Sequence, residues 1–303
     1  MSARKVMLLA GEASGDTLGA ELAKSLIEAD PKISCIGAGG SRMKNAGVDI
    51  QIDLTQHAVI GVWEAIQNYG KFKKFFNQLL SVAEQCKPDA IVLIDNPGFN
   101  LRFAAALRDL AQEHIGKWRP RIVQYISPQI WAWHESRVHS IARDIDLLLS
   151  IFPFEKEWYG NRGVLVKFVG HPIFDEWTPT DKTDLCKLLN INKDKPIITL
   201  YPGSRKQELN RHLPLFIKVA EFIKKKNEEI QFVLGLAKNM NLKDFVVPEW
   251  INIEDTNPQK ALECADLAIV ASGTATIEAT VFGTPMIIVY KMRLLSWWLS
   301  KLF

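Results

Sequence analysis

The sequence predicts an α/β protein made of two Rossmann-like domains, each with a doubly wound parallel sheet. Short, almost continuously apolar runs are typical of strands buried on both faces of such a sheet, and they alternate with longer amphipathic runs of helical periodicity. The 303 residues also give the chain the length of two domains. Because ligands bind these sheets at the carboxyl ends of their strands, we expect the two domains to face a cleft.

The first domain is expected over residues 1–178. Its strands are predicted where the apolar runs are short, at residues 5–10, 33–37, 90–94, 122–126, 147–151 and 164–169. Its helices are predicted where apolar residues recur at every third or fourth position, at residues 17–29, 62–86, 101–113 and 135–143. The polar stretch 178–184 contains Pro179 and is interpreted as a linker.

The same alternation begins again in a second domain, expected over residues 179–303. Its strands are predicted at residues 196–201, 231–235, 251–253, 267–271 and 286–290. Its helices are predicted at residues 209–225, 257–264 and 274–282. The loops that follow the strands of both domains are therefore the first places to look for function.

Composition excludes several classes of protein. Hydrophobic residues make up 48% and charged residues 23% of the chain, which is the mixture of a globular protein and not of a disordered or fibrous one. The net charge of +3 is too small to indicate a nucleic-acid partner. The cysteines are scattered without a C-x-x-C pair, so we expect a reduced cytosolic chain without a disulfide framework or a zinc ribbon. No cofactor is expected either. The apolar runs all fall short of the roughly 18 residues of a membrane-spanning helix, which predicts a soluble or peripheral protein.

The loop after the first strand combines small residues with a carboxylate. It reads Gly11-Glu12-Ala13-Ser14-Gly15-Asp16. Small residues let backbone amides approach a ligand, and a helix N-terminus favours an anion there. The spacing fits neither a P-loop nor the dinucleotide fingerprint. The alternative is a tight turn capped by Ser14 or Asp16, although Glu12 has no evident capping role within it.

A second carboxylate, Asp95, stands directly after the predicted strand 90–94. An aspartate at the tip of a buried strand is held rigidly and is partly desolvated, which raises its pKa and suits it to act as a general base. The alternative is an Asx-turn or the N-cap of a helix that begins near Pro97. The position alone leaves both interpretations open.

Two tryptophans follow the next strand, in the run Ser127-Pro128-Gln129-Ile130-Trp131-Ala132-Trp133. Beside a Ser-Pro turn they are candidates for the wall of an apolar or sugar-binding site, and the alternative is core packing. His171 has no nucleophile near it in a motif and is interpreted as structural.

The second domain offers two loops that suit phosphate groups. Gly203-Ser204-Arg205 follows one strand, and its arginine could bind a phosphate with its forked guanidinium. Ser272-Gly273-Thr274 follows another strand at the start of a helix, which favours an anion. Glu278, one turn into that helix, could accept hydrogen bonds from sugar hydroxyls. The combination predicts a nucleotide-sugar donor held without a metal, and simple capped turns are the alternative.

Seven motifs in order resemble one family. They lie at residues 11–16, 94–100, 127–133, 153–155, 170–171, 202–205 and 271–275. Together they resemble the lipid-A-disaccharide synthases, which are inverting glycosyltransferases of the two-domain GT-B fold. The tryptophan pair and the loop at residues 11–16 count against two rivals of similar fold, a lipid-linked N-acetylglucosamine transferase and a UDP-sugar 2-epimerase.

The resemblance implies a reaction and a place for it. A 2,3-diacylglucosamine would leave UDP and join the 6-hydroxyl of 2,3-diacylglucosamine 1-phosphate, on the cytosolic face of the inner membrane of a Gram-negative bacterium. It implies that Asp95 is the catalytic base, that Glu12 and Arg205 are important for activity, and that the second domain binds UDP. The acceptor is then expected to meet the first domain, at Gly11, Ser14, Gly15, Asp16, Asn100, Ser127, Trp131 and Trp133.

Substrates with acyl chains favour contact with a membrane surface. Residues 69–76 mix aromatic residues with lysines on a predicted helix, as interfacial helices do, so we expect contact through Phe72, Lys73, Lys74, Phe75 and Phe76. Residues 294–299 are a weaker candidate. The alternative for both is an apolar stripe that faces the core.

The sequence departs from the family in three places. Relatives often have aspartate at the position of Gly98 and arginine at that of His134. The family also continues beyond the position of Phe303, so the chain is expected to be a truncated form. An inactive nucleotide-sugar-binding fragment is therefore one alternative function, and a homodimer is a possible assembly.

Overall fold

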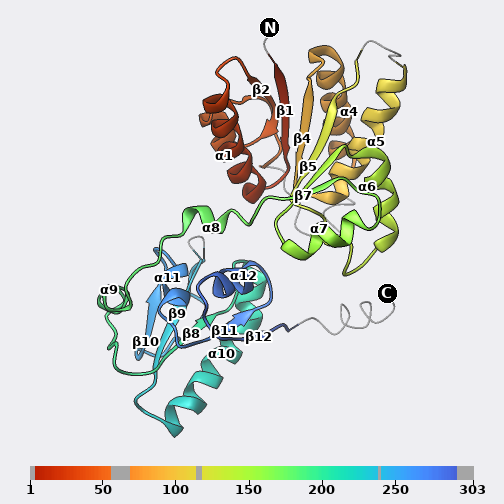
Figure 1. The fold of residues 1–303 in the computed structure, drawn as a ribbon. Coiled ribbons are helices and arrows are strands. Elements are labelled where there is room, and N and C mark those ends of the chain that lie inside the picture. The colour runs from red at the N-terminus through yellow and green to blue at the C-terminus, as the bar shows by residue number, and fades with distance from the viewer. Residues whose placement is uncertain (1–3, 56–68, 114–117, 238–239, 292–303) are drawn as a thin grey trace. The chain divides into compact units, whose positions relative to one another are not determined.

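Two parallel sheets organise the chain in the computed structural model, which describes residues 4–55, 69–113, 118–237 and 240–291 (Figure 1). The first sheet belongs to a unit of residues 1–172 and the second to a unit of residues 173–303. The division falls before residue 178, because the segment that follows Pro172 is fastened to the second unit.

The first unit contains a seven-stranded parallel sheet of order β3-β2-β1-β4-β5-β6-β7. Its strands are β1 (Lys5–Ala10), β2 (Ser34–Gly39), β3 (Asp49–Asp53), β4 (Ala90–Ile94), β5 (Arg121–Tyr125), β6 (Leu147–Ser150) and β7 (Val166–Phe168). The order reverses between β1 and β4, which pair directly, with Ala10 opposite Ile94. In a doubly wound sheet this reversal is where ligands bind.

Helices cover both faces of this sheet. Their bounds are α1 (Ala13–Ala29), α2 (Ser41–Asn45), α4 (Tyr69–Cys86), α5 (Pro97–Glu113), α6 (Val138–Asp144), α7 (Pro153–Gly160) and the 3₁₀ turn η2 (Glu135–Arg137). On one face Ala20 and Ala23 of α1 pack with Val92 and Ile94. On the other face α4, α5, α6 and α7 share one buried cluster with the sheet.

The second unit has a five-stranded parallel sheet of order β10-β9-β8-β11-β12. Its strands are β8 (Ile197–Tyr201), β9 (Gln231–Gly235), β10 (Ile251–Glu254), β11 (Leu267–Ala271) and β12 (Met286–Val289), and its helices are α8 (Ile173–Glu176), α9 (Lys182–Leu188), α10 (Lys206–Lys226), α11 (Gln259–Glu263) and α12 (Thr274–Val281). The order reverses between β8 and β11. The loops after these two strands are the ones that the sequence selects for phosphate binding.

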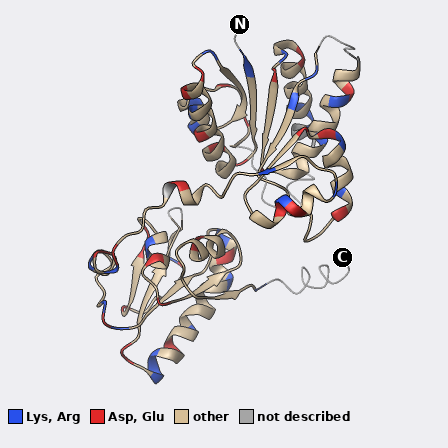
Figure 2. Ribbon diagram, viewed as in Figure 1, with Lys and Arg blue, Asp and Glu red and all other residues tan. Residues whose placement is uncertain are grey.

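Charged residues lie mainly on helices and loops, and the strands contain few of them (Figure 2). The basic end of α10 is formed by Lys224, Lys225 and Lys226, whose charges complement the negative end of the helix dipole. Within the described part of the chain, every helix is too short or too polar to cross a bilayer.

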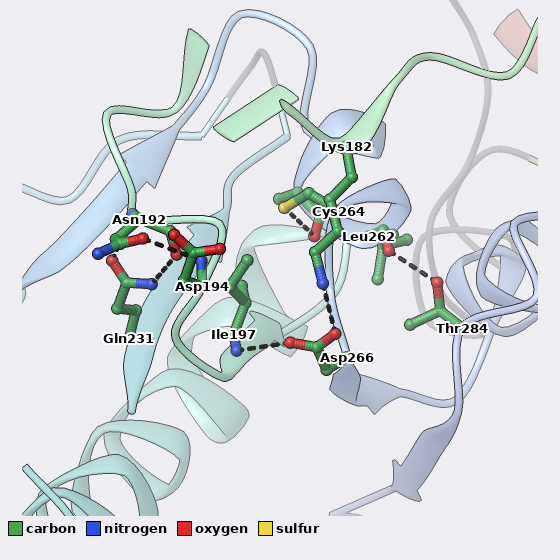
Figure 3. A network of polar contacts seen from close by, with 10 residues as sticks. Lys182, Asn192, Asp194, Ile197, Gln231, Leu262, Cys264, Asp266 and Thr284 are labelled. Carbon is green, nitrogen blue, oxygen red and sulfur yellow. Dashed lines mark hydrogen bonds and ion pairs between the residues drawn. The ribbon is translucent and has the colours of Figure 1, made fainter. Parts of the chain in front are cut away.

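The prediction of a linker at residues 178–184 is wrong for its second half. Helix α9 begins at Lys182, because the side chain of Asp181 accepts a hydrogen bond from the Thr183 amide at 2.7 Å and caps it. Lys182 also binds Asp266, whose second oxygen accepts from the Ile197 amide (Figure 3). Just upstream, the Trp177 indole and the Thr180 amide both donate to Glu263.

Candidate active site

The site of the first unit begins where the loops after β1 and β4 meet. A side-chain carbon at Gly11 would lie 2.7 Å from the side-chain amide nitrogen of Asn96, so the two loops lie in contact and the Asn96 side chain would have to move if Gly11 were replaced. The paired strands thus bring Glu12 and Asp95 to neighbouring loops at the same edge of the sheet.

Glu12 and Ser14 are exposed on the first of these loops. Glu12 occupies the N-cap position of α1, yet its side chain makes no capping hydrogen bond; its backbone carbonyl accepts from the Asp16 amide at 2.9 Å. The carboxylate therefore stands at a helix N-terminus without a capping role, as the sequence indicated.

Asp16 and Gly15 hold the loop in place. The buried carboxylate of Asp16 accepts from the amides of Gly40, Arg42 and Met43 at 2.7, 3.0 and 3.1 Å, which caps α2. A side-chain carbon at Gly15 would lie 3.3 Å from Ala10, so this glycine sets how closely α1 packs on β1. Gly15 and Asp16, both expected to contact the acceptor, are buried and shape the loop instead of forming part of its exposed surface.

Asp95 sits in a tight turn between β4 and α5. Asp95 and Asn96 have φ angles of 51° and 36°, in the left-handed region that few residues other than glycine adopt. Burial raises the pKa of the Asp95 carboxyl, and a hydrogen bond from the Asn96 amide partly offsets the shift. Because Asn96 directly precedes α5, Asp95 does not occupy the capping position, and this disfavours the N-cap alternative.

Two side-chain amides hold this turn from behind. Asn100, expected to contact the acceptor, is buried and donates to the backbone carbonyl of Asp95 at 2.6 Å. Gln124 on β5 donates to the same carbonyl at 3.0 Å. Gln124 was not among the residues that the sequence selected; its signal is a polar residue in the middle of an apolar strand.

A buried carboxylate, Glu155, organises the neighbouring loop after β5. It accepts from the Ser127 hydroxyl, the Trp131 indole at 3.1 Å and the Phe152 amide at 3.4 Å. Burial raises the pKa of Glu155, against the effect of these hydrogen bonds. Ser127 is thus a buried partner of Glu155 and not a surface contact for a substrate.

The tryptophans lie at the surface of the same region. Trp133 is 68% exposed and Trp131 37%, and the ring of Trp131 meets that of Phe154, itself 51% exposed, edge to face at 5.1 Å. The core-packing alternative is therefore wrong for Trp133. We call Trp131, Trp133 and Phe154 the aromatic surface.

Of the residues expected to contact a membrane, some are packed against the core, some are exposed, and others are not described. Phe75 and Phe76 pack against the core of the first unit, and the ring of Phe76 lies 5.5 Å from Phe99 and 5.4 Å from Phe103. The prediction that these two phenylalanines meet a membrane is wrong, because the apolar stripe of α4 faces the sheet. Lys73 and Lys74 are exposed. The side chain of Phe72, residues 62–68 of the predicted helix and residues 294–299 lie outside the described residues.

In the second unit, the loop after β8 binds a carboxylate of the same chain. The Glu208 carboxylate accepts from the amides of Ser204 and Arg205 at 3.1 and 3.2 Å and from the Arg205 guanidinium at 3.0 Å. Gly203 has a φ of 114°, and a side-chain carbon there would lie 2.5 Å from Glu208. The Arg205 side chain remains 66% exposed.

His212, also missed by the sequence reasoning, fixes this loop to the end of the sheet. Its Nδ1 lies 3.0 Å from the Pro202 carbonyl, and its Nε2 lies 3.1 Å from the Lys291 amide. A carbonyl needs a donor and an amide needs an acceptor, so the ring carries its proton on Nδ1 and is neutral in this arrangement.

The loop after β11 is open. Ser272, Gly273 and Thr274 are exposed, and the N-terminus of α12 has no side-chain cap. One turn on, Glu278 accepts from Gln259 at 3.0 Å and from the Tyr201 hydroxyl. Burial raises the pKa of Glu278, while these two hydrogen bonds lower it. A helix N-terminus without a side-chain cap, beside a half-buried carboxylate, suits a phosphate and a neighbouring sugar hydroxyl.

Comparison with known proteins gives one consistent family. The family model described as "Lipid-A-disaccharide synthetase" matches residues 6–303. A lipid-A-disaccharide synthase of Coxiella burnetii (strain Dugway 5J108-111) is 37% identical over 305 residues, which cover 99% of this chain and 79% of that protein. The lipid-A-disaccharide synthase 1 of Legionella pneumophila (strain Paris) is 39% identical over 303 residues, which cover 98% of this chain and 77% of that protein.

The fold is shared more widely. The crystal structure of a UDP-GlcNAc 2-epimerase from Neisseria meningitidis, bound to UDP-GlcNAc, aligns with a TM-score of 0.60 at 13% identity and covers 96% of this chain and 83% of that one. The predicted GT-B type of fold, with two Rossmann-like domains, is thereby confirmed. The family model and both relatives extend over nearly all of the sequence, and the chain therefore belongs to the lipid-A-disaccharide synthase family.

Proposed function

We propose that this chain transfers 2,3-diacylglucosamine from UDP to the 6-hydroxyl of 2,3-diacylglucosamine 1-phosphate. The products are the β-1,6-linked lipid A disaccharide 1-phosphate and UDP. Membership of the family supports the reaction. The observation that carries the mechanism is Asp95, a carboxylate with a raised pKa at the reversal of strand order, next to the loop of Glu12.

The second unit is proposed to bind the donor. Its two candidate loops, residues 203–205 and 272–274, follow β8 and β11, the pair of strands at which the order of that sheet reverses. The open N-terminus of α12 and the exposed guanidinium of Arg205 supply donors and positive charge for the diphosphate. Glu278 is placed to accept from a ribose hydroxyl. The similarly folded Neisseria protein is itself bound to UDP-GlcNAc, which supports a UDP-sugar as the class of donor.

The first unit is proposed to bind the acceptor. Glu12, Ser14 and Asp95 present polar groups, and the aromatic surface offers flat apolar faces for a sugar ring or the start of an acyl chain. Gly11 is also assigned to this acceptor surface, because it lies in the same loop as Glu12 and against the Asn96 side chain.

The proposed chemical step assigns one role to each group. Asp95 takes the proton of the acceptor 6-hydroxyl as that oxygen attacks the anomeric carbon of the donor. The bond from this carbon to UDP breaks, and the electron pair leaves with the diphosphate, which Arg205 and the amides of α12 stabilise. Attack opposite the leaving group inverts the configuration, so an α-linked donor gives the β-linked product.

The protein is proposed to work as a peripheral protein on the cytosolic face of the inner membrane, where substrates with acyl chains reside. The exposed Lys73 and Lys74 suit anionic headgroups, and the aromatic surface suits the interface.

Asp95→Asn tests the proposed base. The amide keeps the shape of the carboxylate but cannot take a proton, so we expect kcat to fall by about 10²–10⁴-fold. UDP binding, measured by calorimetry, and the melting temperature should stay unchanged. Asp49→Asn, at an exposed position on β3 of the same unit, is the matched control.

Two outcomes would contradict the assignments. A full kcat in Asp95→Asn removes the base from the mechanism. Release of a 2-epimer from UDP-GlcNAc, without any transfer to acceptor, would favour the epimerase alternative over the synthase.

A further inference from the structure

We infer that Gln124 and Asn100 are positioning residues for Asp95, whose carboxylate they aim by holding its backbone carbonyl from two sides. The inference rests on the proposed function, in which Asp95 is the base. Gln124 is fully buried in β5, the neighbour of β4, and Asn100 is 2% exposed in the first turn of α5. Buried amides are costly unless they are hydrogen-bonded, so their partners indicate what they do.

Among the described residues, the partners of the two amide nitrogens are all backbone carbonyls at the tips of β4 and β5. Nε2 of Gln124 lies 3.0 Å from the Asp95 oxygen, 3.1 Å from that of Ile126 and 3.3 Å from that of Tyr125. Nδ2 of Asn100 lies 2.6 Å from the Asp95 oxygen and 3.2 Å from that of Ile94. The Asp95 amide in turn donates to the Tyr125 carbonyl at 2.9 Å. The residue is therefore fixed at both ends of its backbone.

The backbone at this point needs such support. Asp95 and Asn96 have positive φ angles, and Ile126, at the exit of the neighbouring strand, has a φ of 69°. A β-branched residue tolerates this region poorly, and such conformations persist only where their surroundings enforce them. Gln124 contacts a carbonyl in each of the two strained turns and so ties them together.

In terms of folding stability alone, glutamine is not the most favourable residue at position 124. Its Oε1 is buried and has no hydrogen-bond partner among the described residues. An apolar side chain of the same shape would avoid that unsatisfied acceptor but would lose the hold on Asp95. The residue present is the one that orients the carboxylate.

Gln124→Met and Asn100→Leu remove the donors and keep much of the shape. For each variant we expect kcat to fall about 10- to 100-fold, because a misplacement of about 1 Å at a reacting group can cost this much. The KM for the UDP-sugar should not change. A relaxed turn exposes the Asp95 carboxyl to water and lowers its pKa, so the acid limb of kcat/KM should move to lower pH. Gln51→Met, the same change at an exposed position on β3, is the control and should leave all three quantities unchanged.

Combination with Asp95→Asn separates this inference from the proposed function. If Gln124 acts through Asp95, then Asp95→Asn/Gln124→Met should be no slower than Asp95→Asn, within about twofold. A multiplied loss in the double variant, or a lower melting temperature with kcat and the acid limb intact, would overturn the positioning role. Full kcat in Asp95→Asn alone would overturn the base itself and the inference with it. If Gln124→Met does not fold, Asn100→Leu gives the same comparison.

Discussion

At the scale of single residues, the two neighbouring carboxylates of the first unit differ in their surroundings. Glu12 is exposed at a helix N-terminus, whereas Asp95 is partly buried in a turn that its neighbours hold rigidly. Burial favours the protonated form of Asp95 and so brings its pKa closer to the working pH of an enzyme. The two groups therefore suit different tasks, and the raised pKa supports the proposal that Asp95 is the proton acceptor.

The direction of this pKa shift predicts the pH dependence of activity. A base works only when it is deprotonated, and the pKa of Asp95 is raised, so the acid limb of kcat/KM should have its midpoint above that of an ordinary aspartate. Asp95→Asn should lose this limb. Initial rates at saturating donor and at acceptor concentrations well below its KM, from acid to neutral pH, measure it, with a melting curve at each pH to exclude unfolding. A limb that persists unchanged in the variant would belong to another group.

At the scale of elements, the bounds predicted from the sequence agree best with the structure for the most apolar segments. The strands at residues 5–10, 90–94, 231–235 and 267–271 have the predicted bounds, because a central strand buried on both faces is an unbroken apolar run. Strand β3 escaped prediction because its sequence alternates polar with apolar residues at the edge of the sheet. Helices α7 and α9 escaped because each is short and takes its stability from tertiary contacts.

Helix α4 shows a different limit of sequence reasoning. An amphipathic stripe with flanking lysines is the same pattern whether its apolar side meets a membrane or a sheet. In the structure Phe76 packs against Phe99 and Phe103 of α5, so this side of α4 faces the core and not a membrane. Such contacts between separate helices are not visible in a local pattern.

Phe76→Ala should therefore destabilise the protein instead of releasing it from membranes. Removing a fully buried phenylalanine costs about 3–5 kcal/mol, and the partial burial of Phe76 reduces the expected loss in the free energy of unfolding to roughly 2 kcal/mol. Urea unfolding followed by circular dichroism measures it. Lys74→Ala, on the exposed side of the same helix, is the control and should change stability by less than about 0.5 kcal/mol. A folded Phe76→Ala of normal stability that no longer binds anionic vesicles would restore the membrane interpretation.

At the scale of the whole molecule, both units have the same plan. In each, the strand order reverses between the first strand of the sheet and a later one, and the candidate residues follow those two strands. The sequence could select these loops because each comes directly after an apolar run. It could not supply the strand order, since parallel pairing joins segments far apart in the chain, nor the hold of Gln124 and Asn100 on Asp95, which depends on that pairing.

The proposal that the second unit binds the donor predicts which variants weaken the binding of UDP. Glu278→Gln removes the charge from a group proposed to accept from the ribose, and a hydrogen bond to a charged group is worth about 1.5–3 kcal/mol, so the dissociation constant for UDP should rise by about 10- to 100-fold. Asp95→Asn, in the first unit, should leave it unchanged. Isothermal titration of both variants with UDP tests the assignment. Weaker binding in Asp95→Asn, with Glu278→Gln unaffected, would reverse it.

The carboxylate of Glu208 has a consequence for the entropy of binding. A loop that becomes ordered only when its ligand arrives loses conformational freedom at that moment, and the loss is subtracted from affinity. Here the Glu208 carboxylate accepts three hydrogen bonds, which hold the backbone of Ser204 and Arg205, together with the Arg205 guanidinium, in one shape. The ordering of this loop thus belongs to the folding of the second unit, and the nucleotide proposed to bind there would not have to supply it.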